Sequence, residues 1–174
     1  MPTIVTTIGS ASANSYVTSV EASAYFESRL TFQTWSAFDE DTQRIPALLT
    51  AAQRLQRENW LGSRVDTTQA LAWPRDSVFK IDTPTGYFGG FGYAGGDLYL
   101  TTEIPQEVKD AQCELALWLL TRNTQPGAES RRVTQWSADG VSASFEYAGT
   151  INAIPEDVYL PISRLIADVQ IRRG

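Results

Sequence analysis

The segment that most constrains the fold is residues 104–122, IPQEVKDAQCELALWLLTR, which is apolar around most of a helical cylinder. Its apolar residues recur at helical spacing, and Leu117 and Leu120 widen the stripe that starts at Val108. Pro105 suits the first turn, where a missing N–H is tolerated. Because a helix that is apolar on so many sides must be covered by other elements, this segment predicts the central helix of a bundle.

Three further segments have the spacing of amphipathic helices. Thr18 and Glu21 match a capping box, and the next turns place Val20 and Ala24 on the expected apolar face of the first helix. Gly62 suits a C′ position just past the end of the second helix. The expected helices cover residues 19–30, 44–60, 104–122 and the segment that starts at Pro161, and residues 31–43 are expected to form a loop.

A β-hairpin is predicted for residues 131–147, RRVTQWSADGVSASFEY. Asp139-Gly140 is a strong two-residue turn signal, and counting outward from it pairs Trp136 with Ala143. Since an isolated two-stranded hairpin is only marginally stable, this one must pack on the helices or on a neighbouring chain.

The stretch PTGYFGGFGYAGGD, residues 84–97, holds six of the chain's 12 glycines. Glycine is unfavourable inside helices and weakens strands, so the stretch predicts a loop. Four aromatic residues are interleaved with these glycines: Tyr87, Phe88, Phe91 and Tyr93. Their rings either cover the protein's own core or form an interface with another protein, and the many glycines that would need ordering favour the interface.

Together these patterns predict a single domain over residues 1–174, a length that is enough for a substantial core. The expected fold is mainly α: a small four-helix-type bundle with one β-hairpin insertion at 131–147 and a long Gly/aromatic loop inserted at 76–103. A C-terminal helix and tail occupy residues 161–174.

Charge and composition exclude several kinds of chemistry. The chain has a net charge of −6 and no histidine, so neither a Ser-His-Asp triad nor a histidine-ligated metal site can form. We therefore expect no enzyme activity, no catalytic residue, no cofactor and no metal site. The single cysteine, Cys113, could be a reactive thiol, but nothing nearby would lower its pKa, which favours a small core side chain.

Nothing in the sequence indicates a membrane protein. No apolar run approaches the length of a transmembrane helix, and the first 16 residues lack the pattern of a signal peptide. We expect no membrane partner.

Four short motifs in order resemble those of a known family. They are Ser15-Tyr16-Val17, then Trp60-x-Gly62-x-Arg64, then QALAWPR at 69–75, then Ile104-Pro105 with Lys109, Ala111 and Glu114. Over residues 15–120 the chain resembles the tailed-bacteriophage head–tail connector or adaptor family, whose members are often labelled "putative DnaT-like ssDNA-binding protein". Each motif alone is weak, and the ordered set is specific.

The resemblance implies a structural virion protein without chemistry. Such connectors assemble as a ring, usually a dodecamer, under the portal vertex, where they extend the DNA channel and dock the tail or neck. The implied partners are further copies of this chain, the portal protein, a tail or neck protein, and genomic DNA that passes through without sequence-specific binding. The implied location is the head–tail junction of the virion, after synthesis in the host cytoplasm. An acidic channel wall would repel phosphate and let DNA slide.

The family motifs imply roles for particular residues. Trp73 is expected to plug the end of the bundle and Pro74 to fix the chain direction, while Arg75 pairs with a carboxylate; the alternative is that Arg75 contacts portal or DNA. Six residues are expected to be structural: Trp60, Gly62, Arg64, Trp73, Pro74 and Arg75.

This chain departs from the family pattern in the long insertion at 76–103, which we expect to contact a neighbouring subunit or a tail protein. The candidate interface residues are Tyr87, Phe88, Phe91, Tyr93, Trp136, Arg131 and Arg132. The two arginines could instead face solvent. The tail Ile171, Arg172, Arg173 and Gly174 is a candidate portal-docking arm, or alternatively a solvated chain end.

The main rival is the function in the family label, a single-stranded DNA-binding protein of phage replication. Trp35, Tyr87, Phe88 and Trp136 could stack on bases. Against this stands the acidic average charge, since nucleic-acid-binding domains normally show a basic footprint. A carbohydrate-binding module is a weaker alternative, because such modules are usually all-β and three strongly helical patterns are present here.

Overall fold

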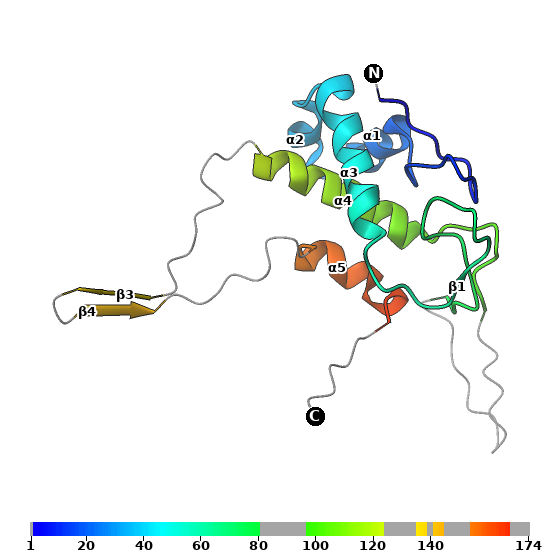
Figure 1. The fold of residues 1–174 in the computed structure, drawn as a ribbon. Helices are drawn as coiled ribbons and strands as arrows, with labels where there is room; N and C mark the ends of the chain where they lie inside the picture. Colours follow the sequence, from blue (N-terminus) through cyan, green and yellow to red (C-terminus); the bar gives the residue numbers. More distant parts are fainter. Residues whose placement is uncertain (1, 81–96, 124–134, 139–140, 145–153, 168–174) are drawn as a thin grey trace, which may run out of the picture.

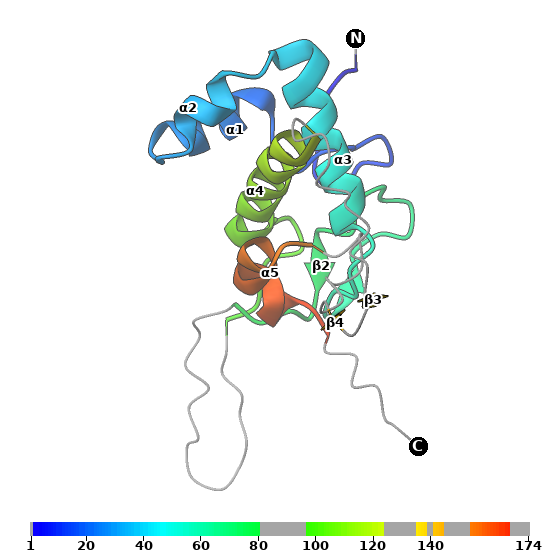
Figure 2. The same ribbon diagram turned by 90° about the vertical axis from the view of Figure 1, so that its left-hand side faces the viewer.

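The longest helix, α4 (Gln106–Asn123), lies in the middle of a mainly helical protein, with α1, α3 and α5 packed against it (Figures 1 and 2). The structure is a computed structural model that describes residues 2–80, 97–123, 135–138, 141–144 and 154–167. The other elements are α1 (Ser19–Glu27), α2 (Phe32–Ser36), the π-helical turn η1 (Glu40–Arg44), α3 (Ile45–Leu55), β1 (Ser63–Arg64), β2 (Arg75–Asp76), β3 (Gln135–Ala138), β4 (Val141–Ser144), α5 (Glu156–Ile162) and the 3₁₀ turn η2 (Ser163–Leu165).

Helix α4 is buried on several sides, as its sequence predicts. Its buried side chains are Val108, Ala111, Gln112, Cys113, Leu115, Ala116, Leu117 and Leu120. The carbonyl of Pro105 accepts hydrogen bonds from the N–H groups of Val108 and Lys109, so the proline directly precedes the helix and begins its first turn. Other elements therefore cover α4, and its apolar area is the main source of the core.

Gln112 is the polar side chain among the buried residues of α4. Its side-chain oxygen accepts from the Tyr16 N–H at 2.9 Å, and its amide nitrogen donates to Ser15 Oγ at 2.7 Å and to the Leu48 carbonyl at 2.9 Å. One buried side chain thus joins α4 to α3 and to the segment that precedes α1. Each polar atom has a partner, which burial requires.

Helix α1 confirms the predicted capping box and corrects the predicted apolar face. The Thr18 side chain accepts from the Glu21 N–H, and the Glu21 carboxylate accepts from the Thr18 N–H at 2.7 Å. The helix ends at Glu27 rather than at residue 30, and its buried residues are Ala22 and Phe26. Val20 and Ala24 are exposed.

Which face of α1 points inward depends on α2, a helix that the sequence pattern does not predict. The pattern of residues 31–43 predicts a loop, but these residues contain α2 and most of η1. Trp35 of α2 is fully buried and stacks on Phe26 with 4.7 Å between ring centroids. Because this aromatic pair excludes a large area from water, it decides which face of α1 points inward.

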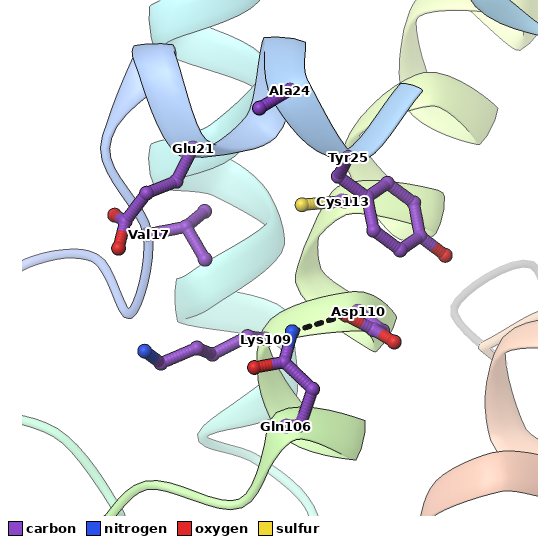
Figure 3. A pocket seen from close by; sticks show the side chains of 8 residues that line it. All are labelled: Val17, Glu21, Ala24, Tyr25, Gln106, Lys109, Asp110 and Cys113. Atoms are coloured by element: carbon purple, nitrogen blue, oxygen red, sulfur yellow. Dashed lines mark hydrogen bonds between the residues drawn. The ribbon is translucent and has the colours of Figure 1, made fainter. Parts of the chain in front are cut away.

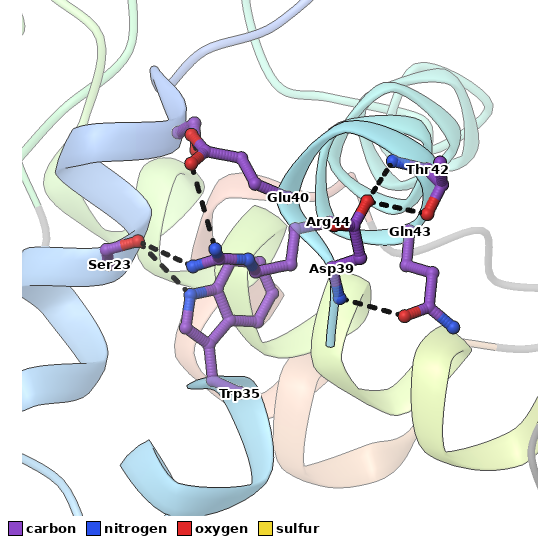
Figure 4. A network of polar contacts seen from close by, with 8 residues as sticks. Ser23, Trp35, Asp39, Glu40, Thr42, Gln43 and Arg44 are labelled. Carbon is purple, nitrogen blue, oxygen red and sulfur yellow. Dashed lines mark hydrogen bonds and ion pairs between the residues drawn. The ribbon is translucent and has the colours of Figure 1, made fainter. Parts of the chain in front are cut away.

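A polar network holds Trp35 in place (Figure 4). The indole Nε1 of Trp35 and the guanidinium of Arg44 both donate to Ser23 Oγ, each at 3.3 Å. Arg44 also forms an ion pair with Glu40 at 3.7 Å. Trp35 is therefore part of the core. It cannot stack on nucleic-acid bases, although the single-stranded DNA-binding interpretation would need it to do so.

Helix α3 ends at Leu55, five residues before the predicted end at Trp60. After Leu55 the chain tightens into a turn in which the Glu58 N–H donates to the Leu55 carbonyl at 3.2 Å, and the indole Nε1 of Trp60 donates to the same carbonyl at 2.9 Å. These bonds satisfy a carbonyl that a continued helix would have used. Gly62 consequently lies in the turn that leads into β1, and it is not a helix C′ residue.

The last helix begins at Glu156 and not at Pro161. The carbonyl of Pro155 accepts from the Val158 and Tyr159 N–H groups, at 3.0 and 2.9 Å, and an acidic first turn suits the positive helix end. Pro161 lies inside the last turn of this short helix. The predicted helix from residue 161 is replaced by η2 and an extended segment in which Ile166 pairs with Trp60.

The β3–β4 hairpin confirms the predicted register. Trp136 pairs with Ala143 and Ala138 with Val141, which is the register counted from the sequence. In Figure 1 the two strands lie apart from the helices. The remaining parts of the predicted hairpin, including Arg131 and Arg132, lie outside the described residues.

We expect Gln112→Ala to lower the free energy of unfolding by about 2–4 kcal/mol, because three hydrogen bonds are lost and buried partners are left unpaired. Urea unfolding followed by circular dichroism measures the change. Gln106→Ala is the matched control, since Gln106 is exposed and its side chain bonds to Asp110 alone among the described residues, and its effect should stay within about 0.5 kcal/mol. Equal effects of both variants would contradict the assigned role of Gln112.

Candidate functional site

Two of the family motifs come together in the structure. β1 and β2 form an antiparallel pair in which Ser63 faces Asp76 and Arg64 faces Arg75. This pairing brings Trp60-x-Gly62-x-Arg64 beside Trp73-Pro74-Arg75. We call these six motif residues the Arg75 junction.

Arg75 holds the junction together through backbone carbonyls. Its guanidinium donates to the carbonyls of Trp60 at 3.3 Å, Gly62 at 2.6 Å and Ala72 at 3.2 Å, and Nε donates to that of Leu61. Burial, with a smaller contribution from Arg64, lowers the pKa of Arg75 from its usual value. The five N–H donors of arginine in one planar fork suit such a cluster of acceptors.

The expected carboxylate partner of Arg75 is therefore wrong, and its partners are main-chain oxygens. The chain leaves α3 and turns sharply, so several carbonyls have neither a helical nor a strand partner. Arg75 satisfies them. This is a structural role, as favoured from the sequence, although the bonding partners differ from those expected.

The tryptophans of the junction are buried in one aromatic group. Trp73 lies edge-to-face with Trp60 on one side and with Tyr99 on the other, at centroid distances of 5.9 and 5.8 Å. Trp73 is 1% exposed, which agrees with its predicted structural role. Tyr16 of the Ser15-Tyr16-Val17 motif is buried too, and burial raises its pKa to about 12.

Gly62 is required by both the backbone conformation and space. Its φ is +68°, and a Cβ atom added there would lie 2.1 Å from the Asp76 carbonyl oxygen and 2.7 Å from Val78 Cγ2. No other residue type fits without moving β2.

Beyond the junction, the ends of the 76–103 insertion pair with one another. The Tyr99 N–H donates to the Val78 carbonyl at 2.9 Å, and the Lys80 N–H donates to that of Asp97 at 2.8 Å. We call residues 78–80 and 97–100 the arm base. Tyr87, Phe88, Phe91 and Tyr93 lie outside the described residues, so their predicted contacts stay predictions.

The arm base has one buried face and one exposed apolar face. Val78 and Tyr99 point into the core. Phe79, Leu98 and Leu100 are 50%, 45% and 65% exposed. Three large apolar side chains are thus exposed to water on neighbouring segments.

A groove of about 590 Å³ lies between α1 and α2 on one side and α5 on the other, with α4 as its floor. We call it the acidic groove. Its charged lining consists of Glu107, Asp110, Glu114, Asp157 and Arg29. Its apolar lining includes Ala111, Leu117, Trp118, Val158 and Pro161.

Only one carboxylate of the acidic groove has a cationic partner among the described residues. Arg29 pairs with Glu114 at 3.4 Å, and the Tyr25 hydroxyl donates to the same carboxylate at 2.9 Å. Burial is the main cause that raises the pKa of Tyr25, and the hydrogen bond to Glu114 raises it further. Glu107 accepts from the Tyr99 hydroxyl, and Asp110 from the Gln106 amide.

A smaller pocket of about 280 Å³ lies on the other side of Tyr25, between α1 and α4 (Figure 3). Lys109 and Glu21 line one side, and the Cys113 sulfur lies between the two helices. Cys113 is 2% exposed, and burial, with smaller effects of Asp110 and Glu114, raises the pKa of its thiol to about 12. Such a thiol is not a nucleophile at neutral pH, which agrees with the core role favoured from the sequence.

Arginines gather beside Trp118 at the edge of the acidic groove. The guanidinium carbons of Arg54 and Arg122 lie 5.9 and 4.9 Å from the centre of the indole ring. Burial lowers the pKa of Arg54, and the nearby charges of Arg122 and Arg57 lower it further. We call Arg54, Arg57 and Arg122 the arginine cluster.

The sequence-based candidates and the structure overlap only at the Arg75 junction. The structure places the six motif residues together, whereas Arg131, Arg132 and the tail from Ile171 to Gly174 lie outside the described residues, and of Trp136 only the backbone is described. Sequence reasoning missed the acidic groove. Its signal was the spacing of Glu107, Asp110 and Glu114, which places three carboxylates on one helix face.

Within the described ranges, no group of three or more acidic, cysteine or histidine side chains could hold a metal ion. No helix in the same ranges combines the length and the apolar character needed to cross a membrane.

We expect Gly62→Ala to destabilise the protein by about 3 kcal/mol or more, because strain at positive φ adds to a clash with the backbone of β2. Gly9→Ala is the matched control. Gly9 also has a positive φ, of +72°, but an added Cβ would meet nothing within 4 Å, so a loss of about 1 kcal/mol is expected. Thermal and urea unfolding compare the two variants, and similar losses would refute the close packing of Gly62.

We expect Cys113 to be inert toward a thiol reagent in the folded protein. With a thiol pKa of about 12, only about one molecule in ten thousand carries a thiolate at pH 8. Ellman's reagent should label the protein fully in urea and negligibly without it. Complete labelling of the folded protein within minutes would show that Cys113 is accessible.

Comparisons with known proteins identify the family. No curated protein and no solved structure matches this chain significantly. A family profile described as "Putative DnaT-like ssDNA binding protein" matches residues 1–170. Because this match covers nearly the whole chain, the protein belongs to the DnaT-like ssDNA-binding protein family.

Proposed function

We propose that the protein is a structural virion protein, a head–tail connector that forms a ring under the portal vertex, extends the DNA channel and docks the tail or neck. The observation that carries this proposal is the arm base. Phe79, Leu98 and Leu100 face water from a segment whose other face is anchored by Val78 and Tyr99. An anchored base with an exposed apolar face is suited to binding another protein.

The Arg75 junction supports the same function. Trp60, Trp73 and Pro74 are buried, and Arg75 bonds to backbone carbonyls, so these residues serve to hold the arm base in position. The four helices α1, α3, α4 and α5 would then form the bundle body of each subunit, and the arm would reach a neighbouring subunit or tail protein. Ring formation, a dodecameric stoichiometry and portal docking by the tail at 171–174 are parts of this proposal.

The distribution of charge is compatible with passing DNA. The net charge is −6, and the described carboxylates on α4 and α5 would repel phosphate where they face a channel. The proposal needs no catalytic group.

Single-stranded DNA binding is the second candidate, and the family description favours it. Among the described residues, the main surface that could bind single-stranded DNA is the arginine cluster with Trp118. Three other tryptophans, Trp35, Trp60 and Trp73, are buried and cannot stack on bases. The described residues therefore suit a protein-binding role better than a stacking platform.

The test is binding to the portal protein of the same phage, followed by negative-stain imaging and sedimentation. We expect rings on the portal, and we expect Phe79→Ser/Leu98→Ser to weaken ring formation at least about tenfold, because the exposed apolar face is lost. Val20→Ser/Leu30→Ser is the matched control, since both residues are exposed aliphatic side chains away from the arm base.

The opposite outcome is also defined. A protein that ignores the portal and binds a labelled single-stranded oligonucleotide, with an affinity that falls steeply with salt, would overturn the connector proposal and establish the second candidate.

A further inference from the structure

The acidic groove and the arginine cluster are both unbalanced in charge. The groove has four carboxylates and one guanidinium, and that guanidinium is already paired with Glu114. Within the described part of the chain, Asp110 and Asp157 have no cationic side chain within ion-pair distance. Such a concentration of like charge with apolar walls favours a cationic occupant.

The arginine cluster has the complementary imbalance. Arg54, Arg57 and Arg122 form no ion pair with any described carboxylate. Burial lowers the pKa of Arg54, and the nearby positive charges of Arg122 and Arg57 contribute in the same direction. In a chain with a net charge of −6, three neighbouring arginines without an acidic partner among the described residues are a surface that gains from meeting negative charge.

Trp118 connects the two surfaces. Its ring lines the acidic groove and also lies against Arg54 and Arg122. Groove and cluster therefore adjoin at this ring. A face with adjacent acidic and basic halves is complementary to its own copy turned by a two-fold rotation.

We propose that this face binds a second copy of the chain, with the arginine cluster of each copy in the acidic groove of the other. The contact is reciprocal, so one two-fold axis near Trp118 satisfies both grooves and both clusters. Arginine suits this role because its planar guanidinium can bind a carboxylate and stack on an aromatic ring at once. The apolar groove lining, including Leu117, Val158 and Pro161, would be covered in the same contact.

This inference goes beyond the connector function and does not depend on it, because it concerns the free protein and requires no portal. A pairing driven by charge should be tight at low ionic strength and weak at high salt. The Debye length falls from about 30 Å at 0.01 M to about 3 Å at 1 M.

The test is a charge-reversal pair measured by sedimentation velocity in low salt. The cluster variant is Arg54→Glu/Arg122→Glu, and the groove variant is Asp110→Lys/Asp157→Lys. We expect wild-type protein to form dimers and each variant alone to dimerise at least about tenfold more weakly, because like charges then face each other. An equimolar mixture of the two variants should recover dimers, since the reversed charges match.

Glu27→Lys/Asp41→Lys is the matched control for the groove variant, because it also replaces two carboxylates by lysines, at exposed positions outside the groove. It should dimerise like the wild type. Circular dichroism confirms that each variant is folded.

Three outcomes would overturn the proposal. They are wild-type protein that stays monomeric in low salt, variants that dimerise as well as the wild type, and a mixture that recovers nothing. The cluster variant could instead lose the wild type's binding to a single-stranded oligonucleotide while its sedimenting mass stays that of the wild type. In that case the arginine cluster binds nucleic acid and the proposed pairing is wrong.

Discussion

The burial of α4 on several sides is the constraint on which the rest of this structure depends. A helix with apolar side chains around most of its surface is stable in water only when other segments cover it, and α1, α3 and α5 do so. Their packing would still leave the buried Gln112 amide without partners if the segment before α1 did not supply Ser15 and Tyr16. The polar contact thus selects one arrangement among the many that hydrophobic burial alone would accept.

The Arg75 junction solves a second problem, which is the unsatisfied backbone after α3. A chain that leaves a helix and reverses direction exposes carbonyls that have no partner, and burying them unpaired is unfavourable. One guanidinium donates to three of these carbonyls and to that of Ala72, and Trp60 donates to the last turn of the helix. The family motif therefore ends a helix and anchors the segment after it, and the anchored segment is the arm base.

The features that sequence analysis predicts correctly are those decided within a few residues. The capping box at Thr18, the central helix and the register of the β3–β4 hairpin all depend on local spacing. The failures concern features decided by distant partners. The inward face of α1 depends on Trp35 in a segment whose pattern predicts a loop, and the partners of Arg75 are carbonyls that carry no sequence signal. The acidic groove needs α1, α4 and α5 together, so only its α4 carboxylates are recognisable from the sequence.

Average charge is a poor guide to the surface for a related reason. A net charge of −6 argues against nucleic-acid binding only if the charges are evenly spread, and they are not. The carboxylates of α4 and α5 gather in one groove, while three arginines from α3, its following turn and α4 gather beside Trp118. When a modest net charge is separated into acidic and basic regions, the surface can bind a second copy of the chain. A uniformly acidic surface would only repel that copy. The sign of a protein's total charge therefore constrains its partners less than the distances between its unpaired charges.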